Sequence, residues 1–150
     1  MKNITAKLIL LTAISIPVVA TAGDVIKKAS AHSVQETMDS FVTLIKSKGM
    51  RVFARIDHKE NAAGVNLKMN DSQVLIFGNP KGGTVLMQKD PTVSLELPLR
   101  VAVYKDDDGK VWLSYHNPQS LKDSYNVSAA AQVLNKVEGG LDKLTSAATK

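Results

Sequence analysis

The chain has 150 residues, 19 of them basic and 14 acidic, with a formal net charge of +5 at pH 7. It contains no cysteine, so disulfides, a thiol nucleophile and a cysteine-ligated metal site are excluded. The basic residues are scattered among the acidic ones, without a cluster or interleaved aromatic residues, which argues against nucleic-acid binding.

The first 22 residues have the pattern of a secretory signal peptide. Lys2 and Lys7 give a short positive region, residues 8–20 are uncharged and mostly apolar, and the small residues that follow fit cleavage after Ala22. This apolar run is shorter than the roughly 20 residues that a permanent membrane helix needs. We therefore expect a periplasmic or secreted protein without a membrane anchor, and a single domain over residues 23–150.

The first part of this domain predicts a strand, a helix and a second strand. The first strand is expected over residues 25–29. Ser33 and Glu36 have the spacing of a capping box, in which each side chain accepts a hydrogen bond from the other residue's backbone N–H. Apolar residues at helical spacing then predict a core helix that ends at Gly49, and residues 51–56 have the pattern of the second strand.

Asp57 follows this strand, and Glu60 stands three residues later. The spacing predicts that Asp57 caps a short helix over residues 58–63, which Gly64 ends. A carboxylate beside an imidazole, as in Asp57-His58, can also fix the ring tautomer or raise its pKa, as a general base or a metal ligand requires. A helix cap and a chemical site are both open interpretations.

The centre of the chain predicts a buried strand that runs into a glycine-rich loop. Residues 74–77 form a continuous apolar run, and Gly78-Asn79-Pro80 must turn the chain immediately afterwards. The loop continues as Lys81-Gly82-Gly83-Thr84, where free backbone N–H groups and a lysine could bind a small carboxylate or phosphate. A tight structural turn is the alternative. The loop lacks the Gly-Lys-Ser/Thr ending of nucleotide-binding loops, and a short helix is predicted around residues 85–89.

Residues 99–106 and 110–116 predict a β-hairpin. A three-residue loop that ends at Gly109 sets Val103 opposite Leu113 and keeps apolar residues on one face of the hairpin. The other face then carries amphipathic pairs, which are Tyr104 with Trp112, Ala102 with Ser114, and Arg100 with His116. This second face is a candidate surface for solvent, a partner or a ligand.

Residues 119–148 predict a C-terminal helical segment. Its apolar seam of Leu134, Val137, Leu141 and Leu144 is interrupted by Gly139-Gly140. The helix either packs on the same domain or contributes to a dimer. Together the elements predict an α+β fold, with a mainly antiparallel sheet of about five strands and helices packed on one face, as in a two-layer sandwich.

Several segments of the chain resemble the bacterial family known as domain of unknown function 302. They are Arg55-Ile56-Asp57-His58, Ile76-Phe77-Gly78-Asn79-Pro80, Gly83-Thr84 with Leu86-Met87, Leu95-Glu96-Leu97-Pro98-Leu99, and Gly109-Lys110-Val111-Trp112 with Tyr115. The resemblance spans nearly the whole chain after the leader, and it implies a compact α+β domain that forms homodimers. The chain departs from the family pattern at Glu96, where an aspartate is usual, and at Val85, where a proline is usual. The chemistry of the family is unassigned, so the resemblance implies no reaction.

Polar and glycine residues follow the ends of the central strands, where binding sites are commonly built. The candidate ligand-binding residues are Asp57, His58, Asn79, Lys81, Gly83, Thr84 and Glu96. We expect them to form one pocket for a small polar or anionic ligand in a homodimer. The alternative is an interaction module without a pocket, which binds a partner through the face of Tyr104, Trp112 and His116.

A copper site is a further alternative, because imidazole and thioether ligands suit copper. His58, His116 and Met87 are the candidate ligands, but they lie in three separate segments without a Met-x-x-Met or His-x-His cluster. The chain also has no Gly-x-Ser-x-Gly nucleophile elbow. The sequence therefore implies no particular cofactor and identifies no reaction.

Overall fold

The computed structural model describes residues 21–22 and 24–150, so the predicted signal-peptide features at Lys2, Lys7 and residues 8–20 lie outside the described residues. An antiparallel sheet has the strand order β1-β2-β6-β5-β4-β3. Its strands are β1 (Thr21–Ala22), β2 (Val25–Ser30), β3 (Arg51–Asp57), β4 (Ser72–Gly78), β5 (Leu99–Lys105) and β6 (Val111–His116). Because β1 has only two residues, five strands carry the sheet, as predicted.

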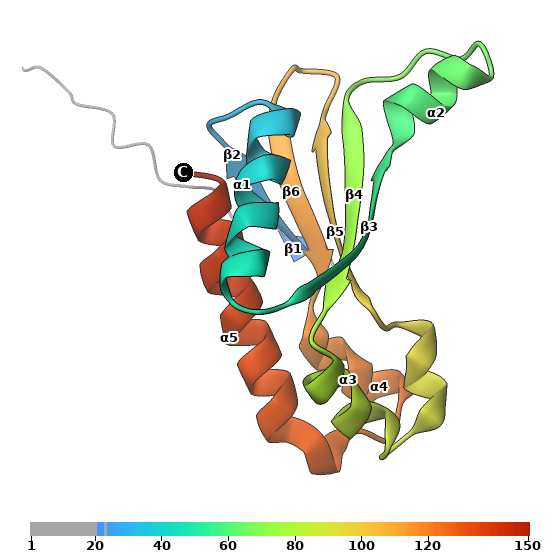
Figure 1. Ribbon diagram of the computed structural model, residues 1–150, viewed down its shortest axis with the longest axis vertical. Helices are drawn as coiled ribbons and strands as arrows, with labels where there is room; N and C mark the ends of the chain where they lie inside the picture. Colours follow the sequence, from blue (N-terminus) through green and yellow to red (C-terminus); the bar gives the residue numbers. More distant parts are fainter. Residues whose placement is uncertain (1–20, 23) are drawn as a thin grey trace, which may run out of the picture.

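Two long helices pack against each other on one face of this sheet (Figure 1). The α-helices are α1 (Val34–Ser47), α2 (His58–Gly64), α3 (Pro80–Met87), α4 (Leu121–Ser124) and α5 (Ala131–Ala148). The described residues also form three 3₁₀ segments, which are η1 (Pro91–Leu95) after α3, η2 (Pro118–Ser120) before α4 and η3 (Ser128–Ala130) before α5. α2 lies at one end of the sheet, and α3 and α4 lie at the opposite end (Figure 1). The predicted α+β fold is confirmed.

The predicted capping box at the start of α1 is present. The backbone N–H of Glu36 donates to Ser33 Oγ at 3.2 Å, and the N–H of Ser33 donates to Glu36 Oε2 at 3.0 Å. These two bonds satisfy backbone donors that the first helical turn leaves without a partner. The first helix of the domain therefore begins where the sequence pattern places it.

The predicted hairpin register is also confirmed, with Val103 opposite Leu113 and Tyr104 opposite Trp112. Gly109 has a φ of +80°, the left-handed conformation that a three-residue hairpin loop requires of its last residue. Asp106 stabilises the loop, because its carboxylate accepts from the backbone N–H of Lys110 at 2.8 Å and from Trp112 Nε1 at 2.7 Å.

One helix begins earlier than the sequence predicts, and the C-terminal helix accommodates two glycines in its interior. α3 begins at Pro80, five residues before the helix predicted around 85–89, because Asn79 accepts a capping bond from the N–H of Lys81 and Pro80 is compatible with a first helical turn. α5 runs without a break through Gly139-Gly140. Packing of its apolar seam against α1 and the sheet outweighs the low helix propensity of glycine.

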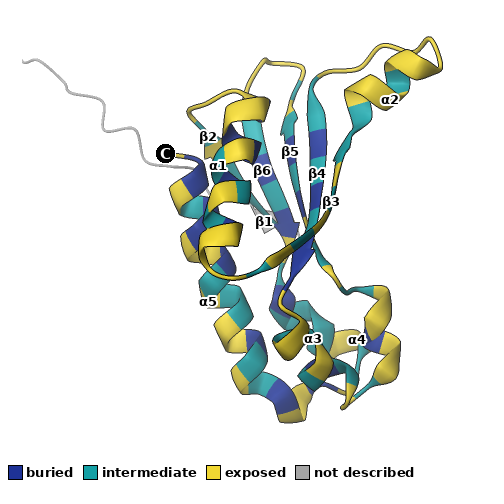
Figure 2. Cartoon of the chain, in the orientation of Figure 1, coloured by how far each residue is buried: buried dark blue, intermediate teal, exposed yellow. Residues whose placement is uncertain are grey.

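The core consists of two hydrophobic clusters, and α5 contributes to both. The main cluster lies between the sheet, α1 and the C-terminal half of α5, where the rings of Phe41 and Phe77 meet edge to face at 5.3 Å. The second cluster lies among α3, η1, η3 and the first turn of α5, and its buried members are Leu86, Val93, Val127, Ala130 and Leu134. Figure 2 shows buried residues in both regions.

A nearly buried lysine ties α5 to the sheet. Lys28 on β2 donates from Nζ to Asp142 Oδ1 and to Ser146 Oγ, each at 2.7 Å. The Lys28 side chain is only 12% exposed, so its ammonium group depends on these partners for the hydrogen bonds that water no longer supplies. This contact fixes α5 on the same sheet face as α1.

Gly139 gives a direct test of the continuous helix. It lies within α5, it is exposed, and a Cβ atom placed there would meet no atom within 4 Å. Because alanine is favoured over glycine in a helix interior by about 1 kcal/mol, we predict that Gly139→Ala raises the free energy of unfolding by about that amount. The melting temperature should rise by about 3 °C in a thermal scan. A lower melting temperature would mean that residue 139 is not in a regular helix.

Candidate functional site

The predicted site residues divide between the two ends of the sheet. Asp57 pairs with Gln73, and Arg51 pairs with Gly78, in the antiparallel β3–β4 ladder. Six residues separate these pairs along the strand, so the Asp57-His58 end lies about 20 Å from the end that carries Asn79. Within one chain, the candidate residues therefore do not come together in the single pocket that we expected, because the end of β3 and the end of β4 lie at opposite ends of the antiparallel ladder.

At the first end, the Asp57 carboxylate caps α2 and anchors a polar network. Oδ1 accepts from the backbone N–H of Glu60 at 3.0 Å, and Oδ2 accepts from Gln73 Nε2 at 3.0 Å. Gln73 is only 6% exposed, and its Oε1 accepts from Arg55 Nε at 2.9 Å. Within the described residues, His58 makes no hydrogen bond to Asp57. The geometry thus favours the helix cap over a paired acid–base site.

The three candidate copper ligands do not lie close together in the structure. His58 begins α2 at one end of the sheet, whereas His116 ends β6 at the opposite end and Met87 ends α3. The three side chains do not converge. Among residues 21–22 and 24–150, no three His, Cys, Asp or Glu side chains lie close enough together to hold a metal ion.

At the second end, the glycine-rich loop is the start of α3. Asn79 satisfies two of its early backbone donors, because its side chain accepts from the N–H of Lys81 at 3.0 Å and its carbonyl accepts from the N–H of Gly83 at 3.0 Å. Thr84 lies further along α3 and is exposed. This arrangement favours the structural alternative for the loop over an anion site made by free N–H groups.

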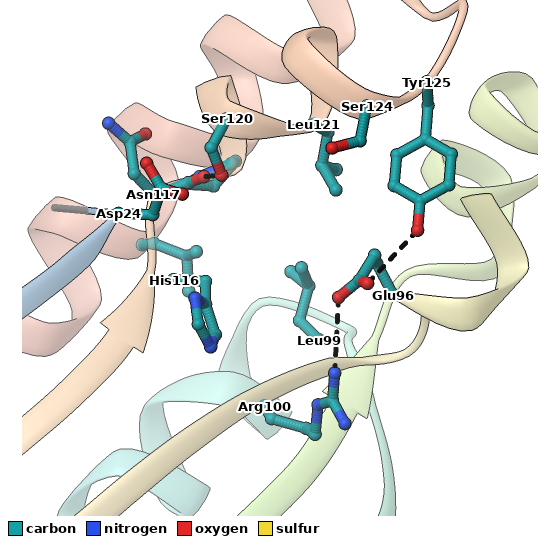
Figure 3. Close-up of a pocket in the computed structure, with 12 residues that line it drawn as sticks. Asp24, Glu96, Leu99, Arg100, His116, Asn117, Ser120, Leu121, Ser124 and Tyr125 are labelled. Carbon is teal, nitrogen blue, oxygen red and sulfur yellow. Dashed lines mark hydrogen bonds and ion pairs between the residues drawn. The ribbon is translucent and has the colours of Figure 1, made fainter.

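Glu96 is the predicted residue that lies in a polar hollow (Figure 3). We call this hollow the polar pocket; its volume is about 220 Å³. Its lining residues are Asp24, Glu96, Leu99, Arg100, His116, Asn117, Pro118, Ser120, Leu121, Ser124, Tyr125 and Leu141. They come from the residue before β2, the end of η1, the start of β5, the end of β6, and the segment from η2 to α5.

The Glu96 carboxylate bridges two donors in the polar pocket. Its Oε1 accepts from the Tyr125 hydroxyl at 3.2 Å, and its Oε2 accepts from Arg100 Nη2 at 3.4 Å (Figure 3). Desolvation, together with the hydrogen bond to Glu96, raises the pKa of Tyr125 above its ordinary value, which favours the protonated phenol as the donor to Glu96. His116 and Asp24 lie on the opposite wall. The pocket therefore presents donors and acceptors of both charge signs to a small ligand.

Sequence reasoning found this pocket only in part. The expected hairpin register already placed Arg100 and His116 on one face, and Glu96 was a candidate residue. Tyr125 and Asp24 were missed, because neither belongs to a local motif and only the folded chain brings them to the strand ends.

A second and larger hollow lies beside the polar pocket. We call it the α3–α5 groove; its volume is about 840 Å³, and α3, α5 and the ends of the central strands line it. The two hollows share Leu99, Pro118, Leu121 and Leu141 as wall residues. Asn79, Lys81, Gly83 and Thr84 line this groove rather than the polar pocket.

Comparison with known proteins gives one family and three curated relatives. The family model described as "Domain of unknown function DUF302" matches residues 26–144. The chain is 40% identical over 107 residues to proteins named "Fluoride-specific ion channel FluC 1" from Brucella suis biovar 1 and from Brucella abortus biovar 1. The match covers 71% of this chain but only 42% and 40% of those proteins, so the chain spans less than half of their length. The protein named "Fluoride-specific ion channel FluC 2" from Brucella melitensis matches to the same extent.

A solved structure supports the fold. The uncharacterised DUF302 protein from Bacillus stearothermophilus superposes with a TM-score of 0.76 at 18% sequence identity, over 86% of this chain and all of the other. Within the part of this chain that the structure describes, no helix combines the length and the apolar character needed to cross a bilayer.

The structural role of Asp57 can be tested by mutation and pH. We predict that Asp57→Ala lowers the free energy of unfolding by about 1 kcal/mol at pH 7, the usual cost of losing an N-cap. The hydrogen bonds from Glu60 and Gln73 hold the pKa of Asp57 below its ordinary value. Its contribution is therefore present above pH ~4, and it is lost as the carboxylate is protonated at lower pH.

The difference between the wild type and Asp57→Ala should accordingly shrink in urea titrations as the pH falls below about 4. His58→Ala is the control and should change stability by less than about 0.5 kcal/mol. A larger loss of stability in His58→Ala than in Asp57→Ala would contradict the assignment of the cap.

Proposed function

The chain belongs to the DUF302 family, and on this premise we propose that it is an exported homodimeric protein that binds a small polar ligand in the polar pocket. The observation that carries the proposal is the convergence of Glu96, Arg100, His116 and Tyr125, from separate elements, on a hollow of about 220 Å³. A few polar groups that point into a concave site are the usual arrangement for binding a small molecule.

The charges of the pocket indicate the class of ligand. Arg100 and the Tyr125 hydroxyl donate hydrogen bonds, and Glu96 and Asp24 offer carboxylate oxygens. A zwitterion or a small hydroxy acid can satisfy both kinds of group at once. The Brucella relatives are named as fluoride channels, which adds the fluoride ion to the ligands that merit testing.

The proposed export is compatible with the polar pocket, because removal of the signal peptide would leave every pocket residue in the mature chain. Cleavage after Ala22 would remove β1 but would leave Asp24 and all of β2 in place. The five remaining strands keep their pairing, and each lining residue of the polar pocket stays in the mature chain. The proposed ligand site thus does not depend on the leader.

The homodimer is supported by the sheet face opposite α1 and α5. Its side chains include Val74, Ile76, Tyr104 and Trp112, and each of them stays partly exposed. A sheet face of this composition is normally covered by another layer. We propose that a second copy of the chain supplies that layer, which also gives a role to the face that the sequence singled out as an interaction surface.

The polar pocket predicts a ligand-dependent rise in thermal stability. We expect at least one compound in a panel of amino acids, small hydroxy acids and sodium fluoride to raise the melting temperature of the wild type. A ligand at about 100 times its Kd adds about 2.7 kcal/mol, or roughly 8 °C for a domain of this size. Arg100→Met should abolish the rise.

His58→Ala is the matched control in these thermal scans, because His58 lies at the other end of the sheet. It should keep the full ligand-dependent rise. The proposal fails if no compound in the panel stabilises the wild type, or if the effect is lost in His58→Ala and kept in Arg100→Met.

The proposed dimer predicts that a charged substitution on the open sheet face converts the protein to a monomer. Ile76→Glu places a carboxylate in the middle of that face, and we expect the variant to be a monomer in sedimentation analysis. Val65→Glu is the control, because Val65 is 66% exposed and lies next to α2, at one end of the sheet. A wild-type monomer, or a dimer that only Val65→Glu disrupts, would refute this interface.

A further inference from the structure

The floor of the α3–α5 groove is apolar and extends between the two hydrophobic clusters. Side chains from α3, α5 and the strand ends build it, among them Phe77, Leu86, Leu97, Val133 and Val137. At about 840 Å³, the groove lies within the range of sites that bind drug-sized molecules. The site can therefore hold an apolar chain of considerable length.

The charged residues that line the groove are all basic. They are Lys48 after α1, Arg51 at the start of β3, Lys81 on α3, and Lys136 and Lys143 on α5. Among residues 21–22 and 24–150, no Asp or Glu lines the groove. Within the described residues none of these five has a carboxylate partner within 4.0 Å, in contrast to Lys28 and Lys59 elsewhere. The rim is thus positively charged and lacks acidic partners.

One face of α5 combines positive charge with open space for a ligand. Lys136 and Lys143 are seven residues apart, two helical turns, and so lie on the same side of the helix. Gly140 lies between them and also lines the groove, and a Cβ atom at Gly140 would meet no atom within 4 Å. The glycine thus leaves room in the groove between the two lysines.

An irregular strand, β3, also lines the groove. The β3–β4 register shifts between Val52 and Ala54, which leaves Phe53 as the extra residue of a β-bulge. Phe53 is 49% exposed, and its ring centroid lies 5.9 Å from the Arg51 guanidinium carbon. An aromatic ring and a cation therefore stand side by side at the mouth of the groove.

We propose that the α3–α5 groove binds a single-chain amphiphile with an anionic head, of the long-chain fatty acid type. The alkyl chain lies on the apolar floor, and the carboxylate is held by the lysines of the rim. The absence of acidic lining residues selects an anionic head over a cationic one. This inference goes beyond the proposed function and does not depend on the polar pocket, since the two hollows share only apolar wall residues.

Calorimetric titration with sodium decanoate and sodium dodecanoate, both below their micellar concentrations, tests the proposal. We expect one molecule to bind per chain, and dodecanoate to bind about 15-fold more tightly than decanoate if both extra methylenes are buried. Dodecyltrimethylammonium, which has the same chain length and the opposite charge, should bind at least tenfold more weakly than dodecanoate.

Matched variants locate the site. Gly140→Phe fills the groove and should abolish dodecanoate binding, whereas Gly139→Phe, at the exposed neighbouring position, should not. Lys136→Glu with Lys143→Glu should weaken binding roughly tenfold, and Lys68→Glu with Lys105→Glu, at the far end of the sheet, should leave it unchanged. The lysine variants are exposed and test the site even if Gly140→Phe fails to fold.

Three results of these titrations would overturn the proposal. They are no one-to-one binding of dodecanoate, equal affinity for the cationic amphiphile, and full binding by both the groove-filling and the charge-reversed rim variants. Association with phosphatidylglycerol vesicles without uptake of free dodecanoate would also contradict it, because such a result would indicate a membrane-surface contact instead of a groove that holds one chain.

Discussion

The structure depends on α5, a single helix that packs into two separate hydrophobic clusters. The C-terminal half of α5 packs with α1 on the sheet, and its first turn packs with α3, η1 and η3 in a separate cluster. An 18-residue helix is about 27 Å long, which is longer than the strands on which it packs. α5 therefore continues past the strand ends, and its first turn contributes to the second cluster there. Lys28 fixes its position through Asp142 and Ser146 on the main cluster.

This arrangement explains why the hollows lie where they do. The two clusters do not merge along α5, and the space between them is the α3–α5 groove. The polar pocket adjoins it at the same end of the sheet, where β5 begins and β6 ends. Because α1 and α5 cover the same face, Val74, Ile76, Tyr104 and Trp112 on the other face stay partly exposed. The positions of the proposed ligand sites and of the proposed dimer face thus follow from the placement of two helices.

The local structure of this chain could be predicted from its sequence much better than its site. The capping box of Ser33 and Glu36, the cap at Asp57 and the loop at Gly109 each depend on residues within a few positions, and local backbone chemistry decides them. The hairpin register followed from the alternation of apolar residues around that loop. The α+β class could be predicted for the same reason.

Prediction of the site requires knowledge of how the strand ends lie relative to one another. Local sequence patterns do not contain this information. Asp57 and Asn79 both follow a strand and both belong to conspicuous motifs, yet the antiparallel ladder sends them to opposite ends of the sheet. Tyr125 meets Glu96 only because η2 and α4 fold back over the strand ends. The groove was not foreseen, since its basic rim draws on residues from α1, β3, α3 and α5.

The central claim is that ligands bind at the α3–α5 end of the sheet, and that the Asp57-His58 end is structural. Hydrogen exchange measured by mass spectrometry, with and without dodecanoate, tests it most directly. The account predicts slower exchange in residues 80–87 and 136–144 and unchanged exchange in residues 58–64. Slower exchange confined to residues 58–64, or no change anywhere in the chain, would contradict it.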